Sequence, residues 1–369
     1  MTVPDFHLQR SSRDVDALTG RLEEWLATQL PDGSGPRVTI HAGIDANGMS
    51  SETVVLDVAW MEDGEPRIGE YVARVAPAAE DVPVFQSYDL RAQYDVIRLV
   101  GERSDVRVPG VRWLEPTGEV IGSPFFLMDR VPGVVPPDVM PYPFGDNWLF
   151  DATDEEKRRL QDSTVDVLAR LHALPAADFA FLTPHEPGGT PLARNLAHLR
   201  GWYEWAAPEI GSSPTVERAL NWLETNLPAT DEGVLCWGDA RIGNVLYQDF
   251  EPAAVLDWEM ATLGPREMDV SWLVFAHRVF QSIAAVFELP GMPDFLREED
   301  VRAAYEEATG ATLGDLTWYH LYNGVIWCVV FMRTGTRQIR FGEIERPDDV
   351  ETLFHCKPLI DQLLAEVGA

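Results

Sequence analysis

Apolar residues recur at helical or strand intervals along most of the chain, and this pattern changes near residue 132. Leucines spaced four apart from Leu18 to Leu30 predict a helix over 14–30. Extended runs predict five strands, with one helix after the third of them. The strands cover 38–41, 53–60, 71–75, 111–114 and 125–131, and the helix covers 88–101. The first third is therefore predicted to be a mostly antiparallel sheet with one inserted helix.

From Pro132 onward the pattern is mainly helical. Five prolines within 132–143 exclude a regular helix there and favour an ordered loop or connector. Thr153 and Glu156 have capping-box spacing, which predicts the start of a long helix ending before Pro175. Further helices are predicted over 193–207, 214–226, 267–286, 298–308, 314–333 and 348–367, with one extended interruption over 234–257.

This change of pattern favours an α+β, bilobal architecture. We expect a small β-rich lobe over 1–131, a larger helical lobe over 132–369, and a cleft between them.

Charge and composition limit the kinds of partner that the protein can bind. The chain has 29 Lys+Arg against 60 Asp+Glu, a net charge of −31, which excludes nucleic-acid binding because that requires a basic surface. The acidity fits either a solubilising surface or an acidic cleft for a cationic substrate. No apolar run approaches the roughly 18 residues of a membrane span, and the N-terminus lacks a signal-peptide core. The three cysteines lack metal-site spacing, so we expect a cytoplasmic protein without a membrane partner.

The segment 234–269 carries the strongest chemical signal. Asp239 and Asn244 lie five apart in a glycine-containing loop, and two short apolar runs follow with a turn predicted at Glu251-Pro252. If these runs pair as a hairpin ending at Asp257, Asn244 and Asp257 fall on neighbouring strands about 5 Å apart. Oxygen donors of this kind suit Mg²⁺, which prefers one or two carboxylates or amides together with nucleotide phosphates.

Kinases have the same D-x-x-x-x-N spacing in their phosphoryl-transfer loop. In that arrangement the first aspartate accepts a hydroxyl proton, the asparagine binds metal, and a later aspartate bridges metal and phosphates. The alternative interpretation makes Asp239 and Asn244 turn residues and Asp257 a helix cap.

The chain resembles the aminoglycoside phosphotransferase and choline kinase-like family of the protein-kinase-like fold. The likeness runs from about 38 to 345, and is strongest to a bacterial branch akin to the kinase domain fused to some acyl-CoA dehydrogenases. The family motif HxDxxxxN corresponds here to WGDARIGN, so Trp237 replaces the histidine. The resemblance implies that Asp257 is the second metal ligand and that Asp269 braces the backbone of the catalytic loop. It also suggests that Arg241 stabilises charge on the transferring phosphate.

The resemblance also implies a nucleotide site in the first lobe. A loop over 42–53 would cover the phosphates through Gly48, Ser50 and Ser51. Arg74 takes the place of the family's phosphate-pairing lysine, and Gln93 that of its glutamate partner. A neutral amide cannot form that ion pair, so this is the largest departure from the family pattern.

The adenine contacts carry over to the segment FFLMDRV. The resemblance places Met128 as gatekeeper, with the carbonyl of Asp129 and the N–H of Val131 binding adenine. In the second lobe, the arginines at 333, 337, 340 and 346 would suit an anionic acceptor, whereas the overall acidity favours an aminoglycoside. The acceptor stays open at this point.

These residues predict an enzyme that uses ATP and Mg²⁺ to phosphorylate a hydroxyl of a small molecule, either aminoglycoside-like or of hydroxyacyl type. A noncatalytic nucleotide-binding module, motivated by Gln93 and Trp237, is the alternative. A metal-dependent hydrolase using the same carboxylates is a third possibility.

Overall fold

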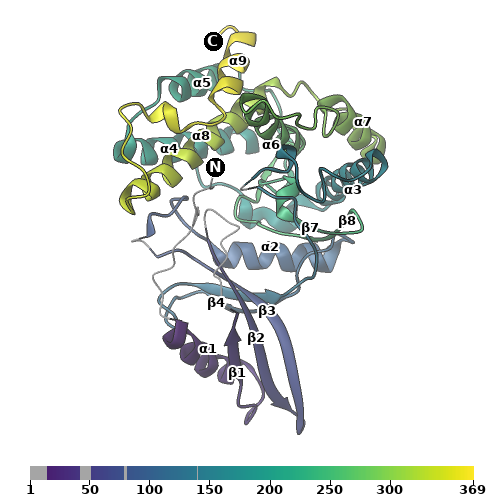
Figure 1. The fold of residues 1–369 in the computed structure, drawn as a ribbon, viewed down its shortest axis with the longest axis vertical. Coiled ribbons are helices and arrows are strands. Elements are labelled where there is room, and N and C mark those ends of the chain that lie inside the picture. The colour runs from purple at the N-terminus through teal and green to yellow at the C-terminus, as the bar shows by residue number, and fades with distance from the viewer. Residues whose placement is uncertain (1–14, 42–50, 79–80, 139) are drawn as a thin grey trace. The chain divides into compact units, whose positions relative to one another are not determined.

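A computed structural model describes residues 15–41, 51–78, 81–138 and 140–369. Gly48 and Ser50 of the predicted phosphate loop lie outside the described residues. Contacts divide the chain into two compact units, one made of 1–98 and 109–131 and the other of 99–108 and 132–369. Figure 1 shows the elements of each unit.

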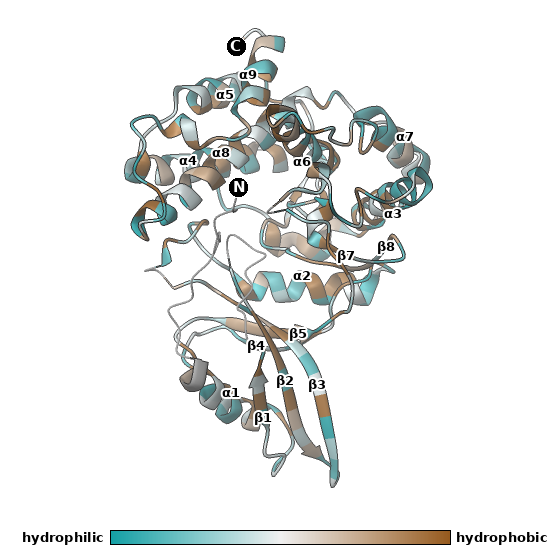
Figure 2. Ribbon diagram, viewed as in Figure 1, coloured by the Kyte–Doolittle hydropathy of each residue, from teal (hydrophilic) through white to brown (hydrophobic). Residues whose placement is uncertain are grey.

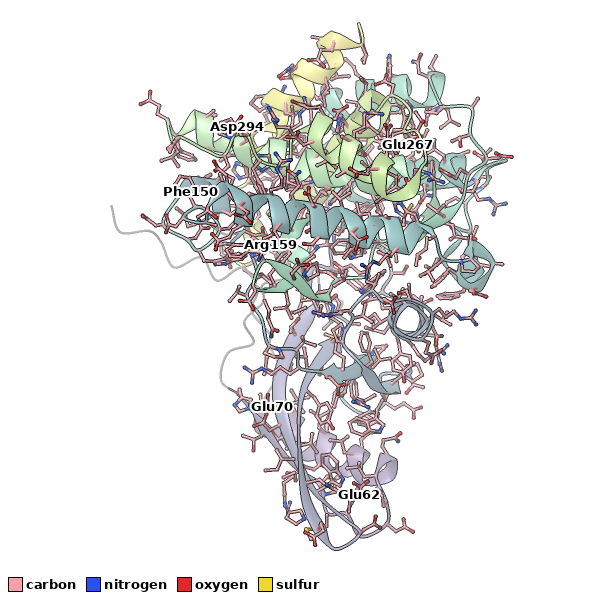
Figure 3. The ribbon with its side chains drawn as sticks, turned by 90° about the vertical axis from the view of Figure 1, so that its right-hand side faces the viewer. Glu62, Glu70, Phe150, Arg159, Glu267 and Asp294 are labelled. Carbon is pink, nitrogen blue, oxygen red and sulfur yellow. The ribbon has the colours of Figure 1, made fainter. Side chains whose placement is uncertain are left out.

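The first unit contains a five-stranded sheet in the order β1-β2-β3-β5-β4, with every neighbouring pair antiparallel. Its elements are α1 Val15–Gln29, β1 Arg37–Ile40, β2 Glu52–Glu62, β3 Glu65–Val75, β4 Val111–Glu115, β5 Phe125–Asp129 and most of α2 Leu90–Arg103. The β2–β3 hairpin turns at Asp63-Gly64, where both residues have positive φ, as a tight hairpin turn requires. Figure 3 shows Glu62 at the tip of this hairpin and Glu70 farther along it.

Helix α1 covers one face of this sheet. Its leucines Leu18, Leu22 and Leu26 are buried against β2 residues such as Leu56 and against Phe125 of β5. The burial of β2 alternates residue by residue, as expected for a strand with one face on a core. The leucine spacing therefore predicted both the helix and the face it buries.

The second unit is mainly helical, with four short strands, β6 to β9, between α5 and α6. The helices are α3 Asp154–His172, α4 Pro191–Ile210, α5 Pro214–Thr225, α6 Glu267–Val286, α7 Glu298–Thr309, α8 Thr317–Arg340 and α9 Lys357–Glu366, with short 3₁₀ turns η2 Tyr142–Phe144, η3 Ala176–Leu182, η4 Ile242–Asn244 and η5 Val350–Leu353. The strands are β6 Val234–Cys236, β7 Val245–Gln248, β8 Glu251–Val255 and β9 Thr262–Gly264. Figure 2 shows that α6 is predominantly hydrophobic, which fits its position in the core of this unit.

The predicted α+β class, the inserted helix and the Thr153 capping box are confirmed. None of the described helices is long and apolar enough to cross a membrane.

Three local predictions are wrong. The hairpin turn lies at Asp249-Phe250 and not at Glu251-Pro252, because both turn residues adopt the positive φ that a two-residue hairpin loop needs. A further strand, β9, lies beyond the predicted extended segment and pairs with β6. The predicted helix 348–367 is broken into η5 and α9, since Pro358 fits only the first turn of a helix.

We expect Leu26→Ala to destabilise the first unit by about 3 kcal/mol, because it removes fully buried methyl groups and leaves a cavity. Urea unfolding followed by circular dichroism measures the change. Ile68→Ala, at a largely exposed position on β3, is the matched control and should change the free energy of unfolding by less than about 0.5 kcal/mol. Equal effects of the two substitutions would contradict the packing described for α1.

Candidate active site

A buried carboxylate hydrogen-bonds to the main chain of the loop that follows β6. Asp269, in the first turn of α6, is fully buried and accepts hydrogen bonds from the main-chain N–H of Trp237 (2.7 Å) and of Gly238 (2.9 Å). The two residues that donate these hydrogen bonds immediately precede Asp239 in the chain. The structure therefore confirms the expected brace, and hydrogen bonds from N–H groups to a charged acceptor are among the stronger ones in proteins.

Trp237 ties this loop to the loop that follows β8. Its side chain is fully buried, and its indole N–H lies 2.8 Å from the carbonyl of Leu256 and 3.2 Å from that of Asp257. The tryptophan that replaces the family histidine thus supports the loop packing through a side-chain donor of its own.

Backbone conformation fixes the same region. Gly238 has a φ of 91°, and a Cβ at this position would lie 2.1 Å from the carbonyl oxygen of Met260. No other residue fits such an approach. Asp257 has a φ of 58°, uncommon outside glycine and typical of residues held in place by their surroundings.

Two side chains orient the carboxylate of Asp239, and a third holds one of them in place. Oδ1 accepts hydrogen bonds from the indole N–H of Trp272 (2.8 Å) and from Nε of Arg241 (3.0 Å). Arg241 also forms an ion pair with Asp138 through Nη1. The side chain of Asp239 keeps 15% of its surface exposed, so it is not fully enclosed by these contacts.

Arg241 is firmly cationic in this setting. Burial would lower the pKa of Arg241, but the charges of Asp138 and Asp239 and the hydrogen bond to Asp138 raise it above its ordinary value, with a smaller contribution from Asp257. Among the described residues its Nη2 has no hydrogen-bond partner, so one face of the guanidinium remains available as a donor.

Asn244 and Asp257 lie at the start and just past the end of the β7–β8 hairpin. The carbonyl of Asn244 accepts the N–H of Leu256 at 2.8 Å, which sets the two segments side by side. Its side-chain Nδ2 donates to the carbonyl of Asp239 at 3.1 Å, and this uses the nitrogen end of the amide. Among the described residues nothing hydrogen-bonds to Oδ1. An amide oxygen and a carboxylate are hard donors of the kind that Mg²⁺ prefers, so the set fits that ion.

A second group could be mistaken for a metal site. Among the described residues, His172, Cys236 and Asp269 offer ligand atoms within 4.8 Å of one another. His172 is already engaged through both ring nitrogens, with Tyr305 at 2.6 Å and Asp269 at 3.1 Å. Burial raises the pKa of the Cys236 thiol well above its ordinary value, which disfavours the thiolate that binds metal. The group is therefore a structural support beneath the loop.

The predicted nucleotide residues of the first unit lie on or near β2, β3, α2 and β5. Ser51 is fully buried just before β2, and Arg74 on β3 is buried opposite Phe126 in the register of β5. Gln93 is buried on α2.

The predicted adenine-binding segment lies at the end of β5. Met128 is partly buried there, and the Asp129 carboxylate pairs with Arg112 at 2.6 Å while its N–H donates to Gly110. The N–H of Val131 has no partner among the described residues.

The arginines suggested for an anionic acceptor do not act as one group. Arg333 is buried, stacks over the Trp205 ring at 3.9 Å and pairs with Glu209 at 2.8 Å. Arg337 is also buried, whereas Arg340 and Arg346 are exposed. An anion that bound Arg333 would therefore have to compete with Glu209 and Trp205 for the guanidinium.

Comparison with known proteins decides the family. Residues 56–317 match the model of the phosphotransferase enzyme family, well over half of the chain. The chain belongs to this family.

Individual relatives are distant. The chain is 26% identical over 210 residues to mouse acyl-CoA dehydrogenase family member 10, a match that covers 56% of this chain and 18% of that protein. The chain thus spans about a fifth of that relative's length.

The solved structures that it resembles share the fold. One is a putative aminoglycoside phosphotransferase from Ralstonia eutropha, with a TM-score of 0.65, 21% identity, and coverage of 94% of this chain and 97% of that one. Another is aminoglycoside phosphotransferase APH(4)-Ia bound to ADP and hygromycin B, with a TM-score of 0.53, 16% identity, and coverage of 92% and 98%. The α+β kinase-like fold of this phosphotransferase is thereby established.

Sequence reasoning missed two residues of the candidate site. Trp272 lies three residues after Asp269 on α6, so helical spacing could have placed both on the face toward the loop. Asp138 lies in the proline-rich run, where no periodic signal points to Arg241.

The segment that carries Asp138 is fixed by a buried pair. The hydroxyl of Tyr142 lies 2.8 Å from Nδ1 of His277, and Nε2 of His277 lies 3.1 Å from the Met292 carbonyl. Burial lowers the pKa of His277 to about 4, partly opposed by the bond to Met292. The folded phosphotransferase therefore holds this histidine neutral.

This pair predicts a loss of stability in acid. The unfolded chain binds the His277 proton below a pKa of about 6.5, while the folded chain resists it until about 4, so stability falls as pH drops through that window. Between pH 8 and pH 5 the wild type should lose about 2 kcal/mol more than His277→Gln. Urea unfolding at both pH values measures this, and an identical pH dependence of the two proteins would show that His277 is not held neutral.

Proposed function

We propose that this chain is an ATP- and Mg²⁺-dependent O-phosphotransferase whose acceptor is a hydroxyl of a small molecule. The observation that carries the proposal is the partly exposed Asp239 carboxylate, oriented by Trp272 and Arg241 on a loop that Asp269 fixes. Catalysis of phosphoryl transfer relies mainly on positioning and electrostatics, and this arrangement supplies both.

Each residue has a role in the proposed reaction. Asp239 accepts the proton of the acceptor hydroxyl. At the same time the oxygen of that hydroxyl forms a bond to the γ-phosphorus. The bond from that phosphorus to the bridging oxygen breaks, and the electron pair leaves with ADP. The open Nη2 of Arg241 is suited to donate to the equatorial phosphate oxygens.

Mg²⁺ would be held by Oδ1 of Asn244 and the carboxylate of Asp257. When bound, it neutralises developing charge on the phosphates. Residues of the first unit complete the nucleotide set in this proposal: the open N–H of Val131 and the carbonyl of Asp129 for adenine, Met128 as gatekeeper, and Arg74 for the phosphates. Gly48, Ser50 and Ser51 would cover the phosphates, and Gln93 would hydrogen-bond Arg74.

Two acceptor classes remain within the proposal. The solved relative bound to hygromycin B supports an aminoglycoside-like acceptor, and the chain's net charge of −31 fits a cationic one. The acyl-CoA dehydrogenase relatives support a hydroxyacyl-type acceptor. Exposed apolar side chains at the end of α6, Val286 and Phe287, would suit an apolar chain, and the Phe144 ring lies tilted against Phe287 with centroids 5.9 Å apart.

The decisive test is transfer of labelled γ-phosphate from ATP to a panel containing hygromycin B and hydroxyacyl thioesters. With an accepted substrate, Asp239→Asn should lower kcat by a factor of about 10² to 10⁴, because the proton acceptor is lost. Asp249→Asn is the control, since it replaces an exposed aspartate at a positive-φ turn position that asparagine tolerates.

The alternatives give different results. ATP binding without transfer to any acceptor would favour the noncatalytic module. Phosphate release that needs no acceptor would favour a hydrolase. A kcat of Asp239→Asn equal to that of Asp249→Asn would remove the proposed role of Asp239.

A further inference from the structure

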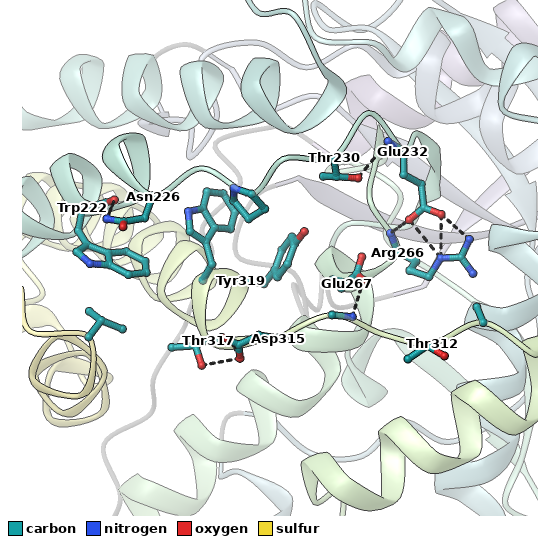
Figure 4. Close-up of a pocket in the computed structure, with 15 residues that line it drawn as sticks. Trp222, Asn226, Thr230, Glu232, Arg266, Glu267, Thr312, Asp315, Thr317 and Tyr319 are labelled. Atoms are coloured by element: carbon teal, nitrogen blue, oxygen red, sulfur yellow. Dashed lines mark hydrogen bonds and ion pairs between the residues drawn. The ribbon is translucent and has the colours of Figure 1, made fainter.

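The second unit contains a pocket that the proposed reaction does not use. It has a volume of about 840 Å³ and lies among the end of α5, the start of α6, the α7–α8 connection and the start of α8 (Figure 4). This volume is within the range of pockets that hold small organic molecules. Its lining contains none of the residues assigned to the acceptor proton, the metal or the nucleotide.

Charge in the lining favours a cation. Glu232, Glu267 and Asp315 contribute three carboxylates, and Arg266 is the one cationic side chain among the described lining residues. Arg266 forms a bidentate ion pair with Glu232, which raises the pKa of its guanidinium. Because its charge is already paired, Arg266 is a poor binding group for an anion. Glu267 accepts one N–H, that of Gly314 at 3.0 Å, and keeps further acceptor capacity.

Helix ends do not reverse this preference. Residues just past the ends of α5, α7 and α9 line the pocket, and so do residues at the starts of α6 and α8. The partial negative charges of the three helix ends and the partial positive charges of the two starts act in opposite senses. The side-chain carboxylates therefore decide the sign of the local potential.

The hydroxyl of a largely buried tyrosine opens onto the pocket, with no hydrogen-bond partner among the described residues. Tyr319 as a residue is 4% exposed, and its hydroxyl oxygen stays accessible from the pocket because no described residue hydrogen-bonds to it or covers it. Figure 4 shows this hydroxyl turned toward the side lined by Thr230 and Glu267. A ligand in the pocket can therefore donate a hydrogen bond to this oxygen.

Aromatic rings complete the lining. Trp222 and Trp318 line the pocket together with Tyr319, and the rings of Trp318 and Tyr319 pack edge to face with centroids 5.2 Å apart. Such rings pack against an apolar or aromatic group and also attract a cation over their faces.

We propose that this pocket binds a primary ammonium compound with an aromatic or apolar body. The ammonium group donates to the carboxylate of Glu267 and to the hydroxyl oxygen of Tyr319, and the body packs on Trp222 and Trp318. This site is separate from the proposed phosphoryl-transfer site and does not depend on the reaction assigned to it.

Isothermal titration without nucleotide tests the proposal with three probes that share one ring: 2-phenylethylammonium, 2-phenylethanol and phenylacetate. The cation should bind at least about tenfold more tightly than the neutral or anionic probe, because only it gains charge-assisted hydrogen bonds. Glu267→Gln and Tyr319→Phe should each weaken its binding, by about tenfold for the lost charge and less for the lost hydroxyl.

Controls separate this site from the catalytic one and from misfolding. Glu267→Gln keeps an oxygen that can accept the Gly314 N–H, and Tyr319→Phe removes a hydroxyl that bonds no described residue, so both variants should keep the wild-type Tm within a few degrees. Asp239→Asn and Glu299→Gln, the latter at an exposed position on α7, should leave the affinity unchanged. Equal binding of the three probes, or weaker binding in Asp239→Asn but not in Glu267→Gln, would overturn the proposal.

Discussion

The buried carboxylate of Asp269 is the constraint on which the arrangement of the second unit depends. A charged group without solvent must be paired or fully hydrogen-bonded, and Asp269 achieves this with two main-chain N–H groups and the ring of His172. Because both N–H donors belong to the residues just before Asp239, satisfying the carboxylate also fixes the start of the loop that carries Asp239. Stability and positioning are served by the same hydrogen bonds.

Further contacts extend this fixed point to the rest of the site. The indole N–H of Trp237 contacts the carbonyls of Leu256 and Asp257. The side-chain amide of Asn244 donates a hydrogen bond to the carbonyl of Asp239. Trp272, on the same helix as Asp269, orients the Asp239 carboxylate itself. The loop that would bind the acceptor proton and the segment that would bind metal are therefore held through main-chain groups as well as side chains, which limits their freedom to move apart.

The sequence predicted the helices and strands better than the turns and long-range contacts that connect them. Helix α1 and the sheet followed from apolar spacing, because one face of each is buried in a continuous core. The turn at Asp249-Phe250 escaped prediction because phenylalanine seldom adopts a positive φ, and proline at 252 is a stronger turn signal. In the site, Asp239, Asn244 and Asp257 stood out by spacing, whereas Asp138 reaches Arg241 across 103 positions and depends on tertiary packing that no local pattern reports. The burial of Arg333 against Trp205 was hidden for the same reason.

The claim that Asp269 fixes the loop that carries Asp239 is tested most directly by amide hydrogen exchange in wild type and in Asp269→Asn. Asparagine keeps the size of the side chain but has one acceptor oxygen, so the account predicts faster exchange at the amides of Trp237 and Gly238, while the amides of β2 and β3 keep their protection. Asp166→Asn, at a half-exposed position on α3, should leave all of these rates unchanged. Unaltered protection of Trp237 and Gly238 in Asp269→Asn would contradict the account.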